Sequence, residues 1–430
     1  MVALAACWMT LAAMGQEHAI AFKGATILPI TGPVIEGGVI VVRAGKIQSV
    51  GGPGTAIPGD AEVHDARGKL IMPGLIDTHS HVDIDGGADR SGPIQAGVRI
   101  LDSINVRGSG MQQAQAGGIT TANIMPGSGH LISGQTLYIK LRDANSVEQL
   151  MMTNRFGRIA GGLKMANGTN SRRDPPFPGT RAKSAALVRE KFIAAREYQD
   201  KIERAAGNPE KMPARDLLLE SLVEVLNRER VVHHHTHRHD DILTVLRLQR
   251  EFGFRVVLQH VSEGWKVADE IAEANVPCSI ILLDSPGGKL EARDVDWKTG
   301  GVLERAGVPT AFHTDDPVTD SRLFLRSAAF AVRAGMSRKA ALEGLTLVPA
   351  RMLDLEDRLG SLEVGKDADF IVLSGDPLSV YTKVLETWVE GVLVFDRNRD
   401  KDRLWATGGY GAGRPRAAQL CCFNEFEEDR

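Results

Sequence analysis

The sequence of 430 residues predicts an α/β fold, namely a (β/α)8 barrel joined to a small β-domain that both ends of the chain build. Three observations support this prediction. The middle of the chain alternates helical stretches with short apolar runs, which indicates parallel strands joined by crossover helices. About seven such runs can be counted, close to the eight strands of a barrel. Both ends of the chain are instead rich in strand and turn patterns.

The β-rich ends predict a composite domain. The turn Ala44-Gly45 separates two β-branched runs, which is a hairpin signal. The segments 365–376 and 384–396 have the same composition near the other end of the chain. We therefore expect residues 19–72 and 358–400 to form one β-domain, with the barrel at residues 73–357.

The strand candidates of the middle region are Leu70–His81, Gly118–Met125, Gly157–Ala166, Arg230–His237, Phe254–His260, Pro277–Leu283 and Val308–Asp316. Two segments interrupt their alternation with helices. Residues 167–180 are rich in Pro, Gly and Arg and predict a long loop over one face. Residues 182–204 and 214–229 have a helical pattern with many charges, which predicts a solvated helical insertion.

The composition limits the classes of partner. The chain has 51 basic and 54 acidic residues and a net charge of -3, which gives no electrostatic reason to expect nucleic acid or an anionic membrane. We therefore expect a small-molecule substrate, and a homo-oligomer is compatible with the sequence. The four cysteines are too few and too scattered for a disulfide framework.

The first residues form an apolar stretch of signal-peptide length. Val2–Met14 is followed by Gly15, and Ala13-Met14-Gly15 has the small side chains of a cleavage site. The basic start of a signal peptide is missing, because Lys23 is the first Lys or Arg. We interpret residues 1–18 as the remnant of a signal peptide, which predicts a periplasmic or secreted protein. If this is an ordinary apolar strand or helix, the protein is cytoplasmic.

No other stretch approaches the ~20 apolar residues of a membrane span. Residues 401–430 are interpreted as a polar tail.

A pair of histidines closes the first strand candidate. Residues 70–81 read LIMPGLIDTHSH, so His79 and His81 follow a second apolar run. Alternate side chains of a strand share a face, so these two imidazoles can bind one cation. This spacing is typical of a metal site, although two histidines at a strand end also occur by chance.

Further ligand types close the later strand candidates. Five of the twelve histidines lie within positions 233–239, where His233, His235 and His237 share one face of a strand. His260 ends the next apolar run, and Asp315 follows the last one. The carboxyl ends of barrel strands open on one face, so these side chains can converge there. Imidazoles and a carboxylate suit Zn²⁺ or a similar divalent ion.

The motifs PGLIDTHSH, HTDDP and LGSLEVGKDADFIVLSGDP, with the later strand-end histidines, resemble the amidohydrolase superfamily and its imidazolonepropionase-like branch. The resemblance extends from about Ala19 to Asp396. It implies a distorted (β/α)8 TIM barrel, a small β-sandwich formed by both terminal regions, and a site with one or two divalent metals, Zn²⁺ above all.

The resemblance also assigns roles to residues. It implies that His79 and His81 are the first-strand ligands, that His235 and His260 are the fifth- and sixth-strand ligands, and that Asp315 is the eighth-strand ligand. A shift from His235 to His233 or His237 stays open.

Lys164 falls where some relatives carry a carboxylated lysine that bridges two metals. Its neighbours differ here, so an ammonium that binds a substrate carboxylate, or a surface lysine with no role, stays open as well.

This ligand set predicts a metal-dependent hydrolase that cleaves a C–N bond in an amide, a cyclic amide or a dipeptide. The metal activates a water molecule, and Asp315 and His260 are the expected catalytic residues, with Asp315 as the proton shuttle. A cyclic amidine deaminase, a lactonase or an organophosphate hydrolase, and a non-catalytic barrel scaffold are the alternatives.

Substrate contacts are predicted from the loops. We expect Pro126–Thr136 to reach over the site, with His130 and Gln135 as candidate polar contacts, and His237 as a third. Arg172, Arg173 and Arg181 lie on or near the Pro-rich loop and could meet a substrate carboxylate. A solvent-facing position is an equal alternative for the loop residues.

Overall fold

The computed structural model describes residues 18–84, 89, 91–282 and 289–408. The stretch interpreted as a signal peptide and residues 409–430 of the tail lie outside this part of the chain, as do Cys7, Cys421 and Cys422. Among the described residues no helix combines the length and the apolar character that crossing a bilayer requires.

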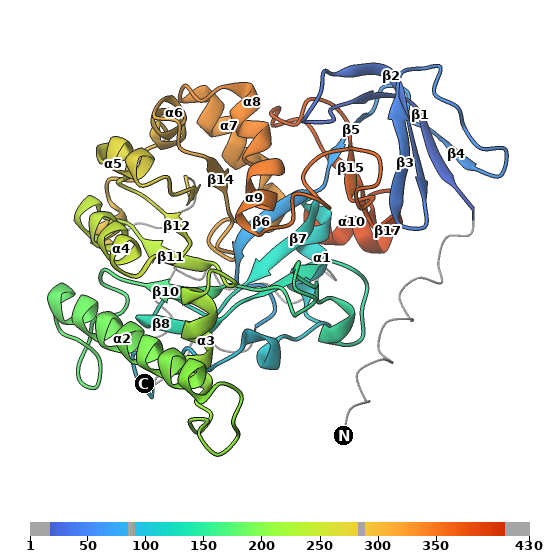
Figure 1. The fold of residues 1–430 in the computed structure, drawn as a ribbon. Helices are drawn as coiled ribbons and strands as arrows, with labels where there is room; N and C mark the ends of the chain where they lie inside the picture. Colours follow the sequence, from blue (N-terminus) through green and yellow to red (C-terminus); the bar gives the residue numbers. More distant parts are fainter. Residues whose placement is uncertain (1–17, 85–88, 90, 283–288, 409–430) are drawn as a thin grey trace.

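One eight-stranded sheet is built from both terminal regions of the chain (Figure 1). Its strand order is β17-β16-β15-β5-β1-β2-β3, and β4 pairs with β1. The predicted hairpin is present, because Ala44 and Gly45 have φ values of 50° and 75° between β2 and β3, as a type I′ turn requires. The strands are β1 (Ile20–Ile27), β2 (Ile35–Arg43), β3 (Lys46–Gly51), β4 (Glu62–Asp65), β5 (Leu70–Pro73), β15 (Phe370–Leu373), β16 (Val384–Val389) and β17 (Val392–Asp396).

The two terminal regions share an aromatic core. The Phe22 ring of β1 lies 5.2 Å from the rings of Phe370 and Trp388, which belong to β15 and β16. Phe370 stacks on Trp388 at 5.7 Å. Burial of these large rings joins segments from opposite ends of the chain, because neither segment can cover its apolar face alone.

The middle of the chain supplies a second group of strands. A six-stranded sheet has the order β14-β13-β12-β11-β10-β8, and a three-stranded sheet has the order β6-β7-β9. The neighbours from β10 to β14 pair in parallel, as do β6 and β7. These strands are β6 (Leu75–Ser80), β7 (Ile119–Ile124), β8 (Ile132–Gln135), β9 (Leu137–Lys140), β10 (Leu163–Ala166), β11 (Val232–Thr236), β12 (Val256–His260), β13 (Cys278–Ile280) and β14 (Thr310–Phe312).

Strands β8 and β9 depart from the sequence prediction, which interpreted residues 126–136 as a loop and the whole group as parallel. β9 pairs with β7 and β8 pairs with β10, both antiparallel. Only residues 125–131 separate β7 from β8, too few for a crossover helix, so the chain turns back instead. β8 and β9 thus connect the two sheets.

The last strand of this series meets the first. Ser80 and Asp316 form a parallel bridge, and the Asp315 backbone N–H donates to the His79 carbonyl at 2.8 Å. Asp77 reinforces the contact, since its carboxylate accepts from the backbone N–H groups of His79 and Thr314, each at 3.1 Å. The strand ends that carry the predicted ligands are therefore held side by side.

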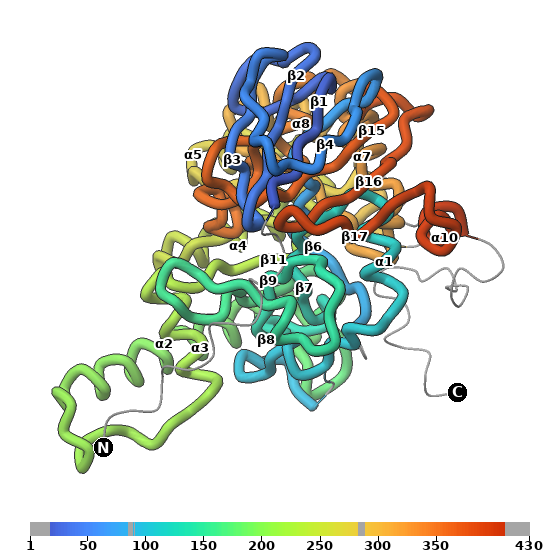
Figure 2. Tube along the Cα trace, turned by 90° about the vertical axis from the view of Figure 1, so that its right-hand side faces the viewer, coloured from blue at the N-terminus to red at the C-terminus, as the bar shows by residue number. Residues whose placement is uncertain are grey.

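Helices lie outside these strands, and α4 to α8 follow one another around β11 to β14 (Figure 1). The predicted insertion is present as α2 and α3, which project from one side of the molecule (Figure 2). The helices are α1 (Ser109–Ala116), α2 (Arg181–Ala205), α3 (Leu217–Leu226), α4 (His239–Phe252), α5 (Ala268–Glu273), α6 (Thr299–Arg305), α7 (Leu325–Arg333), α8 (Arg338–Glu343), α9 (Leu347–Met352) and α10 (Asp400–Thr407).

Candidate metal centre

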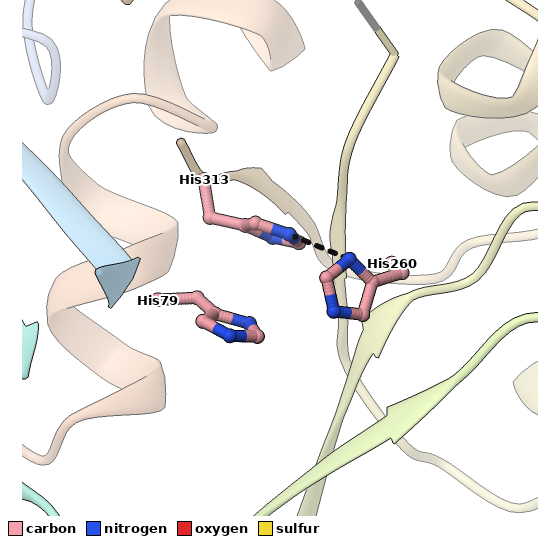
Figure 3. Close-up of side chains that lie close together, drawn as sticks. All are labelled: His79, His260 and His313. Carbon is pink, nitrogen blue, oxygen red and sulfur yellow. Dashed lines mark hydrogen bonds between the residues drawn. The ribbon is translucent and has the colours of Figure 1, made fainter. Parts of the chain in front are cut away.

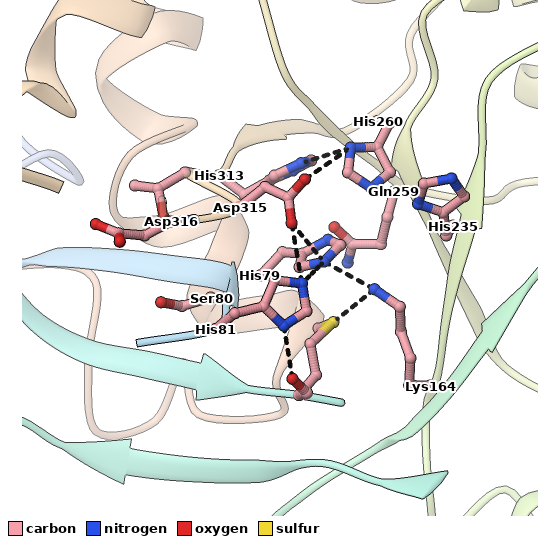
Figure 4. A network of polar contacts seen from close by, with 12 residues as sticks. His79, Ser80, His81, Lys164, His235, Gln259, His260, His313, Asp315 and Asp316 are labelled. Carbon is pink, nitrogen blue, oxygen red and sulfur yellow. Dashed lines mark hydrogen bonds and ion pairs between the residues drawn. The ribbon is translucent and has the colours of Figure 1, made fainter. Parts of the chain in front are cut away.

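The histidine pair at the carboxyl end of β6, with His79 in the strand and His81 just after it, meets Asp315 (Figure 4). The Nε2 atoms of His79 and His81 lie 3.2 Å apart, and Asp315 Oδ1 lies 3.2 Å from the first and 3.0 Å from the second. His79 and Asp315 are buried, and His81 is partly exposed. The strand spacing therefore places both imidazoles on one side, as predicted, and the last strand adds a carboxylate.

A second group of imidazoles lies at the ends of β11 and β12. The ring centroids of His235, His237 and His260 lie 4.3 to 4.8 Å apart, and all three side chains are buried. One nitrogen of each lies within 4.8 Å of one nitrogen of each other ring. Lys289 Nζ approaches from the loop after β13, 3.2 Å from His235 Nε2 and 3.1 Å from His237 Nε2.

Two of the predicted ligands have a left-handed backbone. His260 has a φ of 71° and Asp315 a φ of 50°, values that residues other than glycine seldom adopt. Such conformations persist where the surroundings fix them, and they gather at functional sites. At Asp315 the hydrogen bond from its N–H to the His79 carbonyl supplies such a constraint.

His313 joins the centre, although the sequence analysis gave it no role. Its Nε2 lies 3.3 Å from His260 Nδ1, and its ring stacks on His79 at 4.9 Å (Figure 3). The sequence held a signal for it: His313 precedes Asp315 by two positions at a strand end, the same spacing that singled out His79 and His81.

Lys164 is fully buried, which excludes one of its three alternatives, a surface lysine with no role. Its Nζ lies 2.7 Å from His79 Nε2 and 3.1 Å from the sulfur of Met125 (Figure 4). Lys164 belongs to β10, which lies between β8 and β11 and whose four residues are all buried. The amine thus lies among the predicted ligands.

Burial and nearby charges keep the fully buried imidazoles neutral. Burial, followed by neighbouring lysine and histidine charges, holds the pKa values of His79, His235, His237 and His260 well below the usual value of 6.5. Burial also lowers the pKa of His313 to about 3. Burial alone would raise the pKa of Asp315. The hydrogen bond from His81 and its charge outweigh burial and hold the pKa of Asp315 far below the usual range. Neutral imidazoles and an ionised carboxylate are the forms that bind metal.

The donor set fits a divalent cation. His260 Nε2 is buried and has no hydrogen-bond partner among the described residues, and the same holds for His235 Nδ1. A buried imidazole nitrogen without a partner is costly as a donor but useful as a metal ligand. His79, His81 and Asp315 form one group of ligand atoms, and His235, His237 and His260 form another.

Other predicted residues lie elsewhere. His233 contacts the Tyr138 hydroxyl at 2.9 Å and the Gln259 amide at 3.2 Å, so both of its nitrogens face protein groups outside the centre. His234 is also buried, with its Nδ1 3.0 Å from the His235 carbonyl. The cluster therefore offers His235 and His237, and the shift to His233 is not supported.

Gln135 does not reach over the site, because it belongs to β8 and its amide donates to the Ala96 carbonyl at 3.4 Å. His130 is buried against Phe177, with ring centroids 5.3 Å apart, so it is not solvent-facing. Arg173 lies 3.8 Å above the Phe177 ring and donates to the Gly129 carbonyl, whereas Arg181 pairs with Asp241.

Comparisons with known proteins agree with this arrangement. The model of the amidohydrolase family matches residues 70–397. A solved amidohydrolase from Thermotoga maritima is 35% identical, with a TM-score of 0.82 over 88% of this chain and all of that one. The imidazolonepropionase of Paracoccus denitrificans is 26% identical over 79% of this chain and 88% of its own length. The amidohydrolase tasK of Hapsidospora irregularis is 27% identical over 84% of this chain, which spans only 40% of that relative. The chain belongs to the amidohydrolase family.

Proposed function

We propose that this protein is a metal-dependent hydrolase that cleaves a C–N bond in an amide, a cyclic amide or a dipeptide. The observation that carries the proposal is the position of Asp315, whose Oδ1 lies within 3.2 Å of the Nε2 atoms of both His79 and His81. Membership of the amidohydrolase family supports the same reaction class.

The described side chains offer three overlapping groups of ligand atoms, of which two would each hold a cation. His79, His81 and Asp315 would hold one cation, and His235 and His260, with His237 close by, would hold a second. Zn²⁺ suits this set of imidazole and carboxylate donors. A bound divalent cation of this kind acts as a Lewis acid that polarises a carbonyl and makes water more acidic.

Asp315 is the group that would move the proton. Its Oδ1 faces His79 and His81, whereas its Oδ2 lies 4.0 Å from His260 Nδ1. Because its carboxyl is ionised at neutral pH, it can accept a proton from the attacking water and return it to the leaving nitrogen. The neighbouring imidazoles of His79 and His260 are buried and have pKa values well below 6.5, so they do not compete as acids.

The fold supports the placement of this site. We infer that β6 to β14 with their helices form the distorted (β/α)8 barrel, and that the terminal sheet forms the small β-sandwich. In such a barrel the active site lies at the carboxyl ends of the strands. His79, His235 and His260 all lie near the carboxyl ends of their strands.

The substrate class is open to a direct test. We would incubate the metal-loaded protein with N-acyl amino acids, Xaa-Pro dipeptides, hydantoin-like rings, a cyclic amidine and lactones. The similarity to an imidazolonepropionase favours a cyclic amide. Release of ammonia from the amidine alone would identify a deaminase, and turnover of lactones alone would contradict C–N hydrolysis.

A further inference from the structure

The Nδ1 atom of His260 is the first member of a chain of buried hydrogen bonds. His260 Nδ1 lies 3.3 Å from His313 Nε2, and His313 Nδ1 lies 2.9 Å from the Ser279 hydroxyl. The Ser279 hydroxyl lies 2.6 Å from that of Thr78. All four side chains are buried, and they connect the ends of β12, β14, β13 and β6.

The protons of this chain can run in only two directions. If Ser279 donates to His313 Nδ1, then His313 Nε2–H donates to His260 Nδ1, and the remaining proton of a neutral His260 sits on Nε2. If His260 Nδ1–H donates to His313 Nε2, then His313 Nδ1–H donates to Ser279, and His260 Nε2 carries a lone pair.

The environment of His260 Nε2 distinguishes these directions. This atom is buried and has no hydrogen-bond partner in the described part of the chain. As an N–H it would be a buried donor without an acceptor, which is costly. As a lone pair it can instead bind a cation, and His260 offers one nitrogen to a group of ligand atoms with His235 and His237. The Asp315 Oδ2 atom, 4.0 Å from His260 Nδ1, is too distant to accept that proton instead.

We propose that His313 is a positioning residue that accepts a hydrogen bond from the Nδ1–H of His260. Ser279 and Thr78 orient His313 in turn. The hydrogen bond leaves the lone pair of His260 on Nε2, which is thereby presented to the metal. The inference rests on the proposed metal centre. His313 could otherwise be a ligand with His79 and His260, since one ligand atom of each lies within 4.8 Å of the others. If His260 Nδ1, which lies 3.3 Å from His313 Nε2, were the ligand atom there, the Nε2–H of His260 would be left buried without an acceptor.

Three variants test this role. Ser279→Ala removes the acceptor of His313, and His313→Leu removes the chain. His313→Gln keeps an amide oxygen that can accept from His260 Nδ1. Ser221→Ala is the matched control, because the Ser221 hydroxyl is buried in α3 without a partner among the described residues.

We would measure the affinity of each metal-free protein for Zn²⁺ by competition with a chromophoric chelator, thermal unfolding of the metal-free form, and the visible spectrum after loading with Co²⁺. We expect Ser279→Ala and His313→Leu to lose about 10- to 100-fold in affinity. His313→Gln should stay within a few-fold of the parent with the same Co²⁺ band intensities. Metal-free Ser279→Ala should unfold at a lower temperature than Ser221→Ala, because it leaves the Nδ1–H of His313 buried without an acceptor, so both affinities are compared at a temperature at which both variants are folded.

Each contrary result has a distinct meaning. Parent-like affinity in His313→Leu and Ser279→Ala would overturn the positioning role. Loss of one metal, or a changed Co²⁺ coordination number, in His313→Gln would show that His313 is a ligand and would also overturn it. A parent that binds no metal would instead refute the proposed function.

Discussion

His81 Nε2 lies 3.0 Å from Asp315 Oδ1, although the two residues follow the first and the last strand of the parallel series. The contact depends on the bridge between Ser80 and Asp316, which holds the two strand ends in register. A site assembled in this way combines ligands that no local sequence pattern contains.

The first prediction concerns this contact. His79→Ala and His81→Ala should each lower the bound metal, because each removes an imidazole from the group that contains Asp315, while the fold survives. Metal content by atomic emission and the far-ultraviolet dichroism spectrum check both points. His64→Ala, which removes a histidine from the terminal sheet, is the control. Variants at position 79 or 81 with full metal content would disprove the ligand assignment.

Asp315→Asn should lower kcat by about 10²- to 10⁴-fold, the usual contribution of a general acid–base group, and weaken metal binding less severely. The amide oxygen can still act as a ligand, but it cannot accept the proton. Asp316→Asn is the matched control: Asp316 accepts from the Ser321 backbone N–H at 3.0 Å, so its loss should reduce stability rather than kcat. Turnover of Asp315→Asn within tenfold of the parent would contradict the proton-shuttle role.

Lys164 decides between a one-metal and a two-metal centre. Its buried amine, 2.7 Å from His79 Nε2, is placed where a carboxylated lysine could bridge the two ligand groups. If the bridge forms, the parent should hold two metals per chain, and Lys164→Ala should hold one or none and partly recover activity with short carboxylic acids. Metal counting in both proteins, and the activity of Lys164→Ala with and without added acid, check this. One metal per chain in both proteins would rule out the bridge and leave an ammonium that contacts the substrate.

The fourth prediction concerns pH and Glu263, in the loop after β12. Its Oε2 accepts from the His239 backbone N–H at 3.0 Å and contacts His239 Nδ1 at 2.6 Å, and its Oε1 lies 3.0 Å from Lys266 Nζ. Burial opposes ionisation, but these contacts outweigh it and lower the pKa of Glu263 to about 2 from 4.5.

Because the folded state has the lower pKa, the stabilisation by Glu263 is complete above a pH of about 4.5 and is lost as the pH falls towards about 2. Above a pH of about 4.5, Glu263→Gln should therefore unfold at a lower urea concentration than the parent. This difference should shrink as the pH falls towards about 2. Glu190→Gln, on the exposed face of α2, is the control. A difference that does not depend on pH would contradict this account.

The sequence was sufficient to predict what depends on position along a strand. His79, His235, His260 and Asp315 were identified because each lies near a strand end, and these ends lie together in the structure. The contacts among side chains were not predictable in this way. The contacts of His313 with Ser279 and His260 join different strands and could not be predicted, although its spacing from Asp315 was a signal for the residue itself. Strands β8 and β9 were missed because their antiparallel pairing depends on β7 and β10, and Gln135 was misplaced with them.

The most direct test of metal-dependent C–N hydrolysis is the release of amine from a cyclic amide or dipeptide substrate by the parent, measured after metal removal and again after Zn²⁺ is restored. Asp315→Asn is measured in parallel at equal metal content. The proposed function predicts that release stops on metal removal, returns with Zn²⁺ in the parent, and stays at least about 10²-fold lower in Asp315→Asn. Amine release that continues unchanged in the metal-free parent would contradict it.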